Sequence, residues 1–220
     1  MINLEVSTAG IEELLYSPGN KQPNFRLALM FAAMSANMSL ERNCKLARYL
    51  SQYVDKPLPQ NREELYEGLH VASRARIFGS HLDALYSIDS AFQAGLLTPY
   101  EVLPSGYEAQ CAWRAGLVAI IFGMAEKTIS FCALILSPMT CELVAIDRWH
   151  MKRLGLPIQS LRTNRYLAVE RQIKVERDNL GYSHCPLGLY SAWQWGIVRD
   201  GDNAYQGDVT SHKALSCRWY

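Results

Sequence analysis

Apolar residues recur every three or four positions along most of the chain, and polar residues, Gly or Pro separate the recurring stretches. Spacing of this kind places apolar side chains on one face of an amphipathic helix. Few stretches show the strict alternation of apolar and polar residues that is typical of a β-strand. The pattern therefore predicts helices over residues 10–16, 25–34, 39–54, 61–76, 80–94, 107–122, 126–136, 148–154, 164–177 and 187–198.

Short polar residues stand where several of these helices are expected to begin. Their side chains accept hydrogen bonds from the free N–H groups of a first helical turn. Asn24 is expected to cap the helix over 25–34, and Ser39 and Asn61 are expected to begin the next two helices. Either Thr163 or Asn164 is expected to cap the helix that runs towards residue 177.

The number and spacing of these helices predict an all-α fold. A chain of 220 residues is long enough for one ample core or two intimately packed lobes. We predict a single two-lobed helical bundle over residues 1–220. The first lobe spans roughly 25–136, and the second combines 1–24 with 137–220. Residues 200–220 are expected to pack onto the protein as an ordered tail.

Two charged residues stand in the most apolar part of the sequence. Lys127 lies in the apolar run over 117–136, and Asp147 ends the shorter apolar run over 143–146. Lys and Asp are rarely buried unless they are paired or have a function. The alternative for Lys127 is a side chain whose stem covers apolar surface while its ammonium group reaches water. Opposite charges on neighbouring apolar segments make these residues the leading candidates for a site.

The neighbours of Lys127 predict its place on a helix. Gly123 is expected to end the preceding helix, and the next helix is expected to begin near Ala125. Lys127 then falls in the first turn, where the helix dipole is positive and a cation is disfavoured. This field favours the neutral amine, which is the form that attacks carbon.

The residues around Lys127 and Asp147 carry a family resemblance. Residues 123–129, Gly-Met-Ala-Glu-Lys-Thr-Ile, resemble the hairpin of the endonuclease III-like helix-hairpin-helix DNA glycosylases, whose pattern is Gly-apolar-Gly-x-Lys-Thr-Ala. Residues 146–150, Ile-Asp-Arg-Trp-His, with Arg-Leu-Gly at 153–155, are similar to that family's Val-Asp-Thr-His segment and the Arg-Leu-Gly that follows it. The resemblance covers the second half of the chain. It implies that Lys127 is a Schiff-base nucleophile and that Asp147 is the essential carboxylate.

The sequence departs from the family pattern at three points. Ala125 replaces the second hairpin glycine, Arg148 and Trp149 stand in place of the Thr, and no cysteine cluster for an iron–sulfur centre follows. Downstream, Pro186, the run Ala-Trp-Gln-Trp at 192–195 and Arg199 are similar to a late Pro…Gln…Trp…Arg helix of small, phage-borne relatives. The resemblance therefore points to a small, phage-borne branch of the superfamily without that cluster. We expect no cofactor and no metal.

The resemblance implies a DNA base-excision enzyme, a glycosylase and AP lyase with double-stranded DNA as its partner. The backbone of the hairpin would hold a phosphate, and a damaged or modified nucleotide would be swung out of the stack. Lys127 would then attack its anomeric carbon. The expected DNA contacts are Gly123, Met124, Ala125, Glu126, Thr128, Arg148, His150 and Arg153.

Two other functions stay open. Small phage-borne relatives are associated with hypermodified pyrimidines, so the protein could instead couple an amine or amino acid to an activated 5-hydroxymethyl base in DNA. A non-catalytic DNA-binding module that retains only the hairpin is the third possibility. The role of His150 is also open, since it could be a proton shuttle, a DNA contact or an ordinary packed histidine.

The charge is distributed unevenly along the chain. The formal net charge is +1, which excludes a globally basic nucleic-acid binder. Residues 148–177, however, hold eight basic and two acidic side chains, a net charge of +6, which leaves −5 for the rest. This asymmetry indicates a polyanionic partner, and the alternative is a solvated helix face.

The six cysteines form no Cys-x-x-Cys pair and lack metal-ligand spacing with His. The N-terminal residues lack the features of a signal peptide, and no apolar run is long enough to span a membrane. We therefore expect a cytoplasmic monomer with free thiols that does not interact with membranes.

Overall fold

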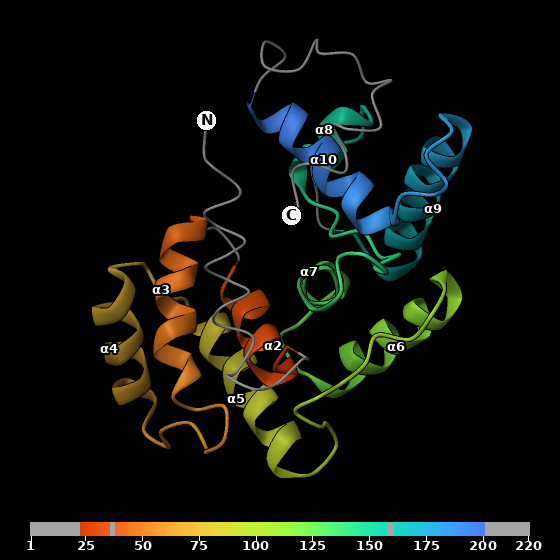
Figure 1. Ribbon diagram of the computed structural model, residues 1–220. Helices are drawn as coiled ribbons and strands as arrows, with labels where there is room; N and C mark the ends of the chain where they lie inside the picture. Colours follow the sequence, from red (N-terminus) through yellow and green to blue (C-terminus); the bar gives the residue numbers. More distant parts are fainter. Residues whose placement is uncertain (1–22, 36–37, 158–160, 201–220) are drawn as a thin grey trace. The chain divides into compact units, whose positions relative to one another are not determined.

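The computed structural model describes residues 23–35, 38–157 and 161–200, so the expected helix over 10–16 and the expected tail after residue 200 lie outside the described residues. The described residues form α-helices joined by loops and turns, with no β-strand among them, and the all-α prediction is confirmed. None of these described helices is both long and apolar enough to cross a membrane. In chain order the helices are α2 (Phe25–Met34), α3 (Leu40–Ser51), α4 (Arg62–Ser73), α5 (Gly79–Gln93), α6 (Tyr107–Ile120), α7 (Glu126–Leu136), α8 (Arg148–Arg153), α9 (Thr163–Asn179) and α10 (Leu187–Asp200) (Figure 1).

Helices α2, α3 and α4 begin where the sequence predicts. The side chain of Asn24 accepts a hydrogen bond from the N–H of Leu27 at 3.0 Å, which confirms the predicted cap. Ser39 and Asn61 are the N-caps of α3 and α4, and each accepts an N–H of its own first turn. These starts follow from local chemistry, because a side-chain oxygen satisfies an N–H that has no partner within the helix.

The start of α9 differs from the prediction. Its N-cap is Arg162, and Thr163 is its first residue. The Thr163 hydroxyl donates to Glu126 Oε1 at 2.5 Å and does not cap the helix. The prediction of Thr163 or Asn164 as the cap was therefore wrong, because the hydroxyl bonds a carboxylate 37 residues away along the chain.

The chain divides into two compact units. The first unit holds the described residues up to 102 together with 117–124, and the second holds 103–116 and the described residues from 125 to 200. These boundaries differ from those of the predicted lobes, the first of which ended at residue 136. The first part of α6 and the whole of α7 belong to the second unit because their polar side chains bond to α9, as described below.

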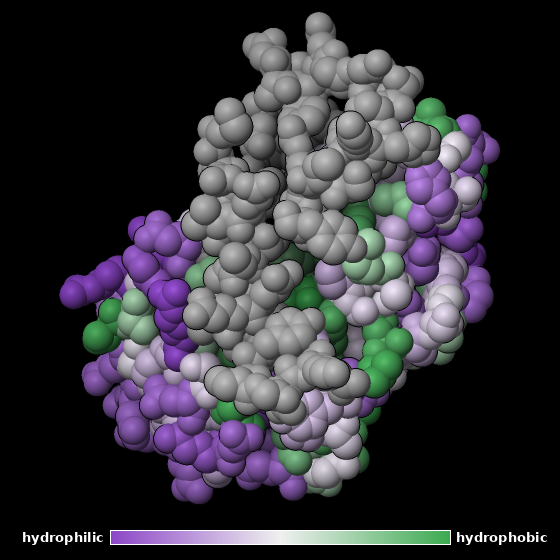
Figure 2. All heavy atoms as spheres, in the orientation of Figure 1, coloured by the Kyte–Doolittle hydropathy of each residue, from purple (hydrophilic) through white to green (hydrophobic). Residues whose placement is uncertain are grey.

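Helix α2 is the centre of the first unit. All ten of its residues are buried, and it packs against α3 and α5. Arg26 pairs there with Asp89 of α5, so the charge inside this apolar helix is compensated. Burial lowers the pKa of Arg26, and the charge of Asp89 opposes that shift. Hydrophilic side chains gather over α3 and α4, on the solvent side of the unit (Figure 2).

In the second unit α10 packs against both α8 and α9. A core cluster joins Ala133 of α7 to Cys141 and Leu143, which belong to the non-helical segment over 141–147. That segment leads directly into α8. The segment that leads to Asp147 is therefore anchored in the core through Cys141 and Leu143.

Candidate functional site

A tight turn joins α6 to α7, as the hairpin pattern predicts. Gly123 has φ of +85°, in the left-handed region that side chains with a Cβ rarely adopt. The N–H of Phe122 donates to Ser87 Oγ at 2.7 Å, which ties the turn to α5 within the first unit. The conformation, rather than lack of space, requires the glycine, because a Cβ there would meet Ala84 at an ordinary 3.4 Å.

Helix α7 begins directly after Ala125, the hairpin residue that departs from the family pattern. Ala125 is its N-cap and offers no side-chain acceptor to the first turn. Glu126 is the first helical residue, and its buried carboxylate accepts the hydroxyl of Thr163. Lys127 follows and is exposed. The first turn of α7 therefore buries the Glu126 carboxylate within the second unit and exposes the Lys127 side chain to solvent.

Asp147 is the N-cap of α8. Its Oδ1 accepts the N–H of Trp149 at 2.9 Å and the N–H of His150 at 3.3 Å. The same oxygen lies 3.0 Å from His150 Nδ1. With 17% of its side chain exposed, Asp147 is held firmly but is not sealed from solvent. The predicted start of this helix after Asp147 is confirmed.

His150 is buried and links Asp147 to α10. Only 4% of it is exposed, and its Nε2 lies 2.7 Å from the hydroxyl of Ser191. Its Nδ1 either accepts the N–H of Asp147, at 3.3 Å, or donates to the Asp147 carboxylate, and the tautomer decides which. In either case His150 orients Asp147, and Ser191 supports it from a position 41 residues further along the chain.

The predicted DNA-contact residues differ in accessibility. Gly123, Ala125 and Arg148 are exposed and Thr128 is half-buried, whereas Met124, Glu126 and His150 are buried. Gly123 and Met124 belong to the first unit, and the other residues of the candidate site belong to the second.

Arg153 is engaged within the protein. Its Nη1 donates to Glu176 at 2.6 Å, and its side chain is 19% exposed. Burial alone would raise the pKa of Glu176, but hydrogen bonds from Arg153 and Gln194 outweigh it and hold that pKa below its usual value. Arg153 is therefore poorly placed to bind a phosphate, and its bond to Glu176 joins α8 to α9.

The basic residues over 148–177 fall into two groups, three that are buried or half-buried in ion pairs and five that are exposed to solvent. Arg153, Lys174 and Arg177 form ion pairs with acidic side chains of the same unit. Among the exposed residues, the Arg148 guanidinium lies 5.0 Å and the Lys152 ammonium 5.7 Å from the ring centre of Trp149. The exposed basic residues of the stretch are Arg148, Lys152, Arg162, Arg165 and Arg171.

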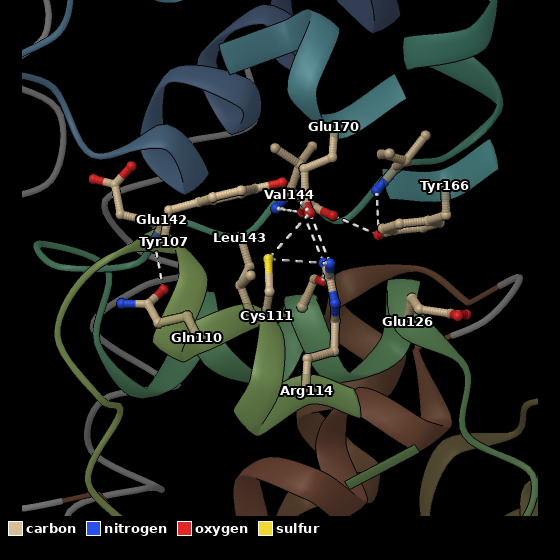
Figure 3. A network of polar contacts seen from close by, with 12 residues as sticks. Tyr107, Gln110, Cys111, Arg114, Glu126, Glu142, Leu143, Val144, Tyr166 and Glu170 are labelled. Atoms are coloured by element: carbon tan, nitrogen blue, oxygen red, sulfur yellow. Dashed lines mark hydrogen bonds and ion pairs between the residues drawn. The ribbon is translucent and has the colours of Figure 1, made fainter. Parts of the chain in front are cut away.

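A buried polar network bonds the segment over 141–147, and the sequence pattern did not predict it (Figure 3). Arg114 of α6 and Glu170 of α9 form two parallel hydrogen bonds of 2.7 Å, and their side chains are 2% and 0% exposed. Burial would lower the pKa of Arg114, but the bonds to Glu170 and its charge raise it above the usual value. Burial also raises the pKa of Tyr166, so its hydroxyl keeps its proton and can donate.

The comparisons with family models, curated proteins and solved structures find no match to this chain.

Proposed function

We propose that the protein binds double-stranded DNA and acts on a damaged or modified nucleotide as a glycosylase and AP lyase. Lys127 is the proposed nucleophile, and Asp147 is the proposed essential carboxylate. The neutral amine of Lys127 attacks the anomeric carbon, and the base leaves with the electrons of the glycosidic bond. Asp147 stabilises the positive charge that develops on the sugar. The bound amine then displaces the ring oxygen from the same carbon, the oxygen leaves as a hydroxyl group with a proton from the amine, and the imine so formed opens a route to strand cleavage.

The fixed orientation of the Asp147 carboxylate is the observation that supports this proposal. Two backbone N–H groups and His150 contact the same carboxylate oxygen, so the direction of the carboxylate is fixed before any substrate arrives. Fixed charges of this kind stabilise a cationic transition state without further reorganisation. Lys127, exposed on α7 of the same unit, is accessible to a nucleotide.

Two features support DNA as the partner. The first turn of α7 has no side-chain cap, and the N–H groups at the start of a helix attract anions. Arg148, Lys152 and the other exposed basic residues of the 148–177 stretch add positive charge without base specificity. We therefore assign phosphate contacts to these residues and not to Arg153.

Borohydride reduction in the presence of DNA tests the proposal. Duplex DNA with an abasic site should yield a covalent complex with the protein, because borohydride reduces the imine to a stable amine. Lys127→Ala should abolish the complex. Lys45→Ala is the matched control, since Lys45 is also an exposed helical lysine but lies in the first unit.

Other outcomes identify the alternatives. A base-modifying transferase would give no sugar adduct, leave the strand intact and change the mass of a 5-hydroxymethyl base when an amine is supplied. A binding module would do neither, and Lys127→Ala would bind DNA like the parent. Either outcome contradicts the proposed reaction.

A further inference from the structure

The segment over 141–147 is not helical, and several of its N–H groups donate to side chains of α6 and α9. The N–H of Glu142 donates to Gln110 Oε1 at 2.7 Å, and the N–H of Val144 donates to Glu170 Oε1 at 2.8 Å. The N–H of Ile146 donates to the Tyr166 hydroxyl at 3.1 Å and is shared with the carbonyl of Val144. Every second N–H is thus held by α6 or α9.

Tyr166 holds the segment at the point nearest to Asp147. Its hydroxyl donates to the carbonyl of Val144 and accepts the N–H of Ile146, the residue immediately before Asp147. Tyr166 itself is 3% exposed, and its ring lies 5.1 Å from the Arg114 guanidinium. The hydroxyl therefore has a fixed position from which it sets the path of the backbone.

Glu170 holds the segment at Val144, two residues before Ile146, and Arg114 fixes the Glu170 carboxylate. The guanidinium bonds both carboxylate oxygens and also donates to Ser130 Oγ of α7 at 2.8 Å. Tyr107 donates to the second oxygen of Glu170 at 3.2 Å but makes no bond to the segment (Figure 3). Arg114 of α6, held by Ser130 of α7, thus fixes the Glu170 carboxylate of α9. That carboxylate in turn accepts a hydrogen bond from the backbone that leads to Asp147.

We infer that Tyr166 and Glu170 are positioning residues that place the Asp147 carboxylate for the reaction. The inference rests on the proposed function, since it assigns these side chains to the support of the proposed essential carboxylate. Both residues hold the backbone that leads to Asp147. Each acts through backbone bonds at Val144 and Ile146, which lie three residues and one residue before it.

Tyr166→Phe is the variant that tests this inference, and Tyr107→Phe is its matched control. Both remove one hydroxyl from the surroundings of Glu170, that of buried Tyr166 or that of half-buried Tyr107, but only Tyr166→Phe releases the backbone next to Asp147. Hydrogen exchange at the N–H groups of Trp149 and His150 reports on the Asp147 cap without any need for activity. Single-turnover borohydride trapping reports on the reaction, and DNA affinity is measured separately.

We expect Tyr166→Phe to speed exchange at both N–H groups and to slow trapping by about tenfold to a hundredfold, because a shift of about 1 Å in a catalytic group has effects of that order. DNA affinity should stay within about twofold, since no proposed phosphate contact changes. Tyr107→Phe should leave exchange and trapping close to those of the parent.

Two outcomes would overturn the inference. One is unchanged exchange at Trp149 and His150 in Tyr166→Phe, and the other is faster exchange with an unaltered trapping rate. If the parent protein does not trap DNA at all, the proposed function fails, and the exchange measurement alone decides whether Tyr166 positions Asp147.

Discussion

Breaking the buried ion pair between Arg114 and Glu170 should cost far more stability than breaking an exposed pair of the same length. Arg114→Met removes the cation and leaves Glu170 with hydrogen bonds from Val144 and Tyr107. Glu170→Gln keeps an acceptor for the N–H of Val144 but leaves the guanidinium without a counter-charge. Both side chains are almost completely inaccessible, so water cannot replace the lost partner.

The magnitude follows from this burial. Removing one partner of a buried pair typically costs about 3–5 kcal/mol, much of it because the remaining charge stays buried. In a chain of this size each kcal/mol lowers the melting temperature by about 2–4 °C. The double variant carries no charge at either position and keeps the acceptor for Val144, so its loss should be well below the sum of the two single losses.

Urea unfolding followed by far-ultraviolet circular dichroism measures this loss, because both units consist of helices. The control is Arg62→Met, which breaks a 2.7 Å pair with Asp83 whose side chains are 49% and 41% exposed. That variant should lose no more than about 1 kcal/mol. Single losses below about 1 kcal/mol that simply add in the double variant would refute the reasoning.

Three further predictions concern charge and thiols. Arg148→Gln should reduce the slope of log affinity for DNA against log salt by roughly 0.9, while Arg42→Gln, the same charge change in the first unit, should leave it unaltered. The pKa of Glu176 is lowered in the folded state, so its contribution to stability is present above the unfolded value of about 4.3 and is lost as the pH falls through the folded value. Glu176→Gln should therefore be destabilising at pH 7 in urea unfolding and less so at about pH 3, with Glu108→Gln as an exposed control. Burial raises the pKa of Cys141 to about 12, so iodoacetamide should alkylate it only after unfolding, and rapid labelling of the native protein, detected by peptide mass, would contradict its burial.

The features that the sequence predicts well are local. Asn24, Ser39, Asn61 and Asp147 mark helix starts because each bonds N–H groups two or three residues away. The turn at Gly123 is local in the same sense, because its positive φ requires glycine. Such interactions are fixed by spacing along the chain and can be inferred without the fold.

The features that the sequence does not reveal depend on partners far along the chain. Arg114 and Glu170 are 56 residues apart, and nothing in their neighbours indicates that both are buried. Ser191 supports His150 from α10 in the same way. Arg153 carries the charge expected of a phosphate contact, yet Glu176 on α9 binds it. Composition gives the number of charges, whereas the tertiary fold decides which of them remain available.

The identity of the lysine in a trapped complex tests the central claim most directly. After borohydride reduction with abasic duplex DNA, digestion and mass spectrometry locate the modified side chain. We predict that the remnant of the sugar is attached to Lys127, in the first turn of α7. The same adduct on another lysine, or on the N-terminal amine, would contradict the assignment of Lys127 as the nucleophile.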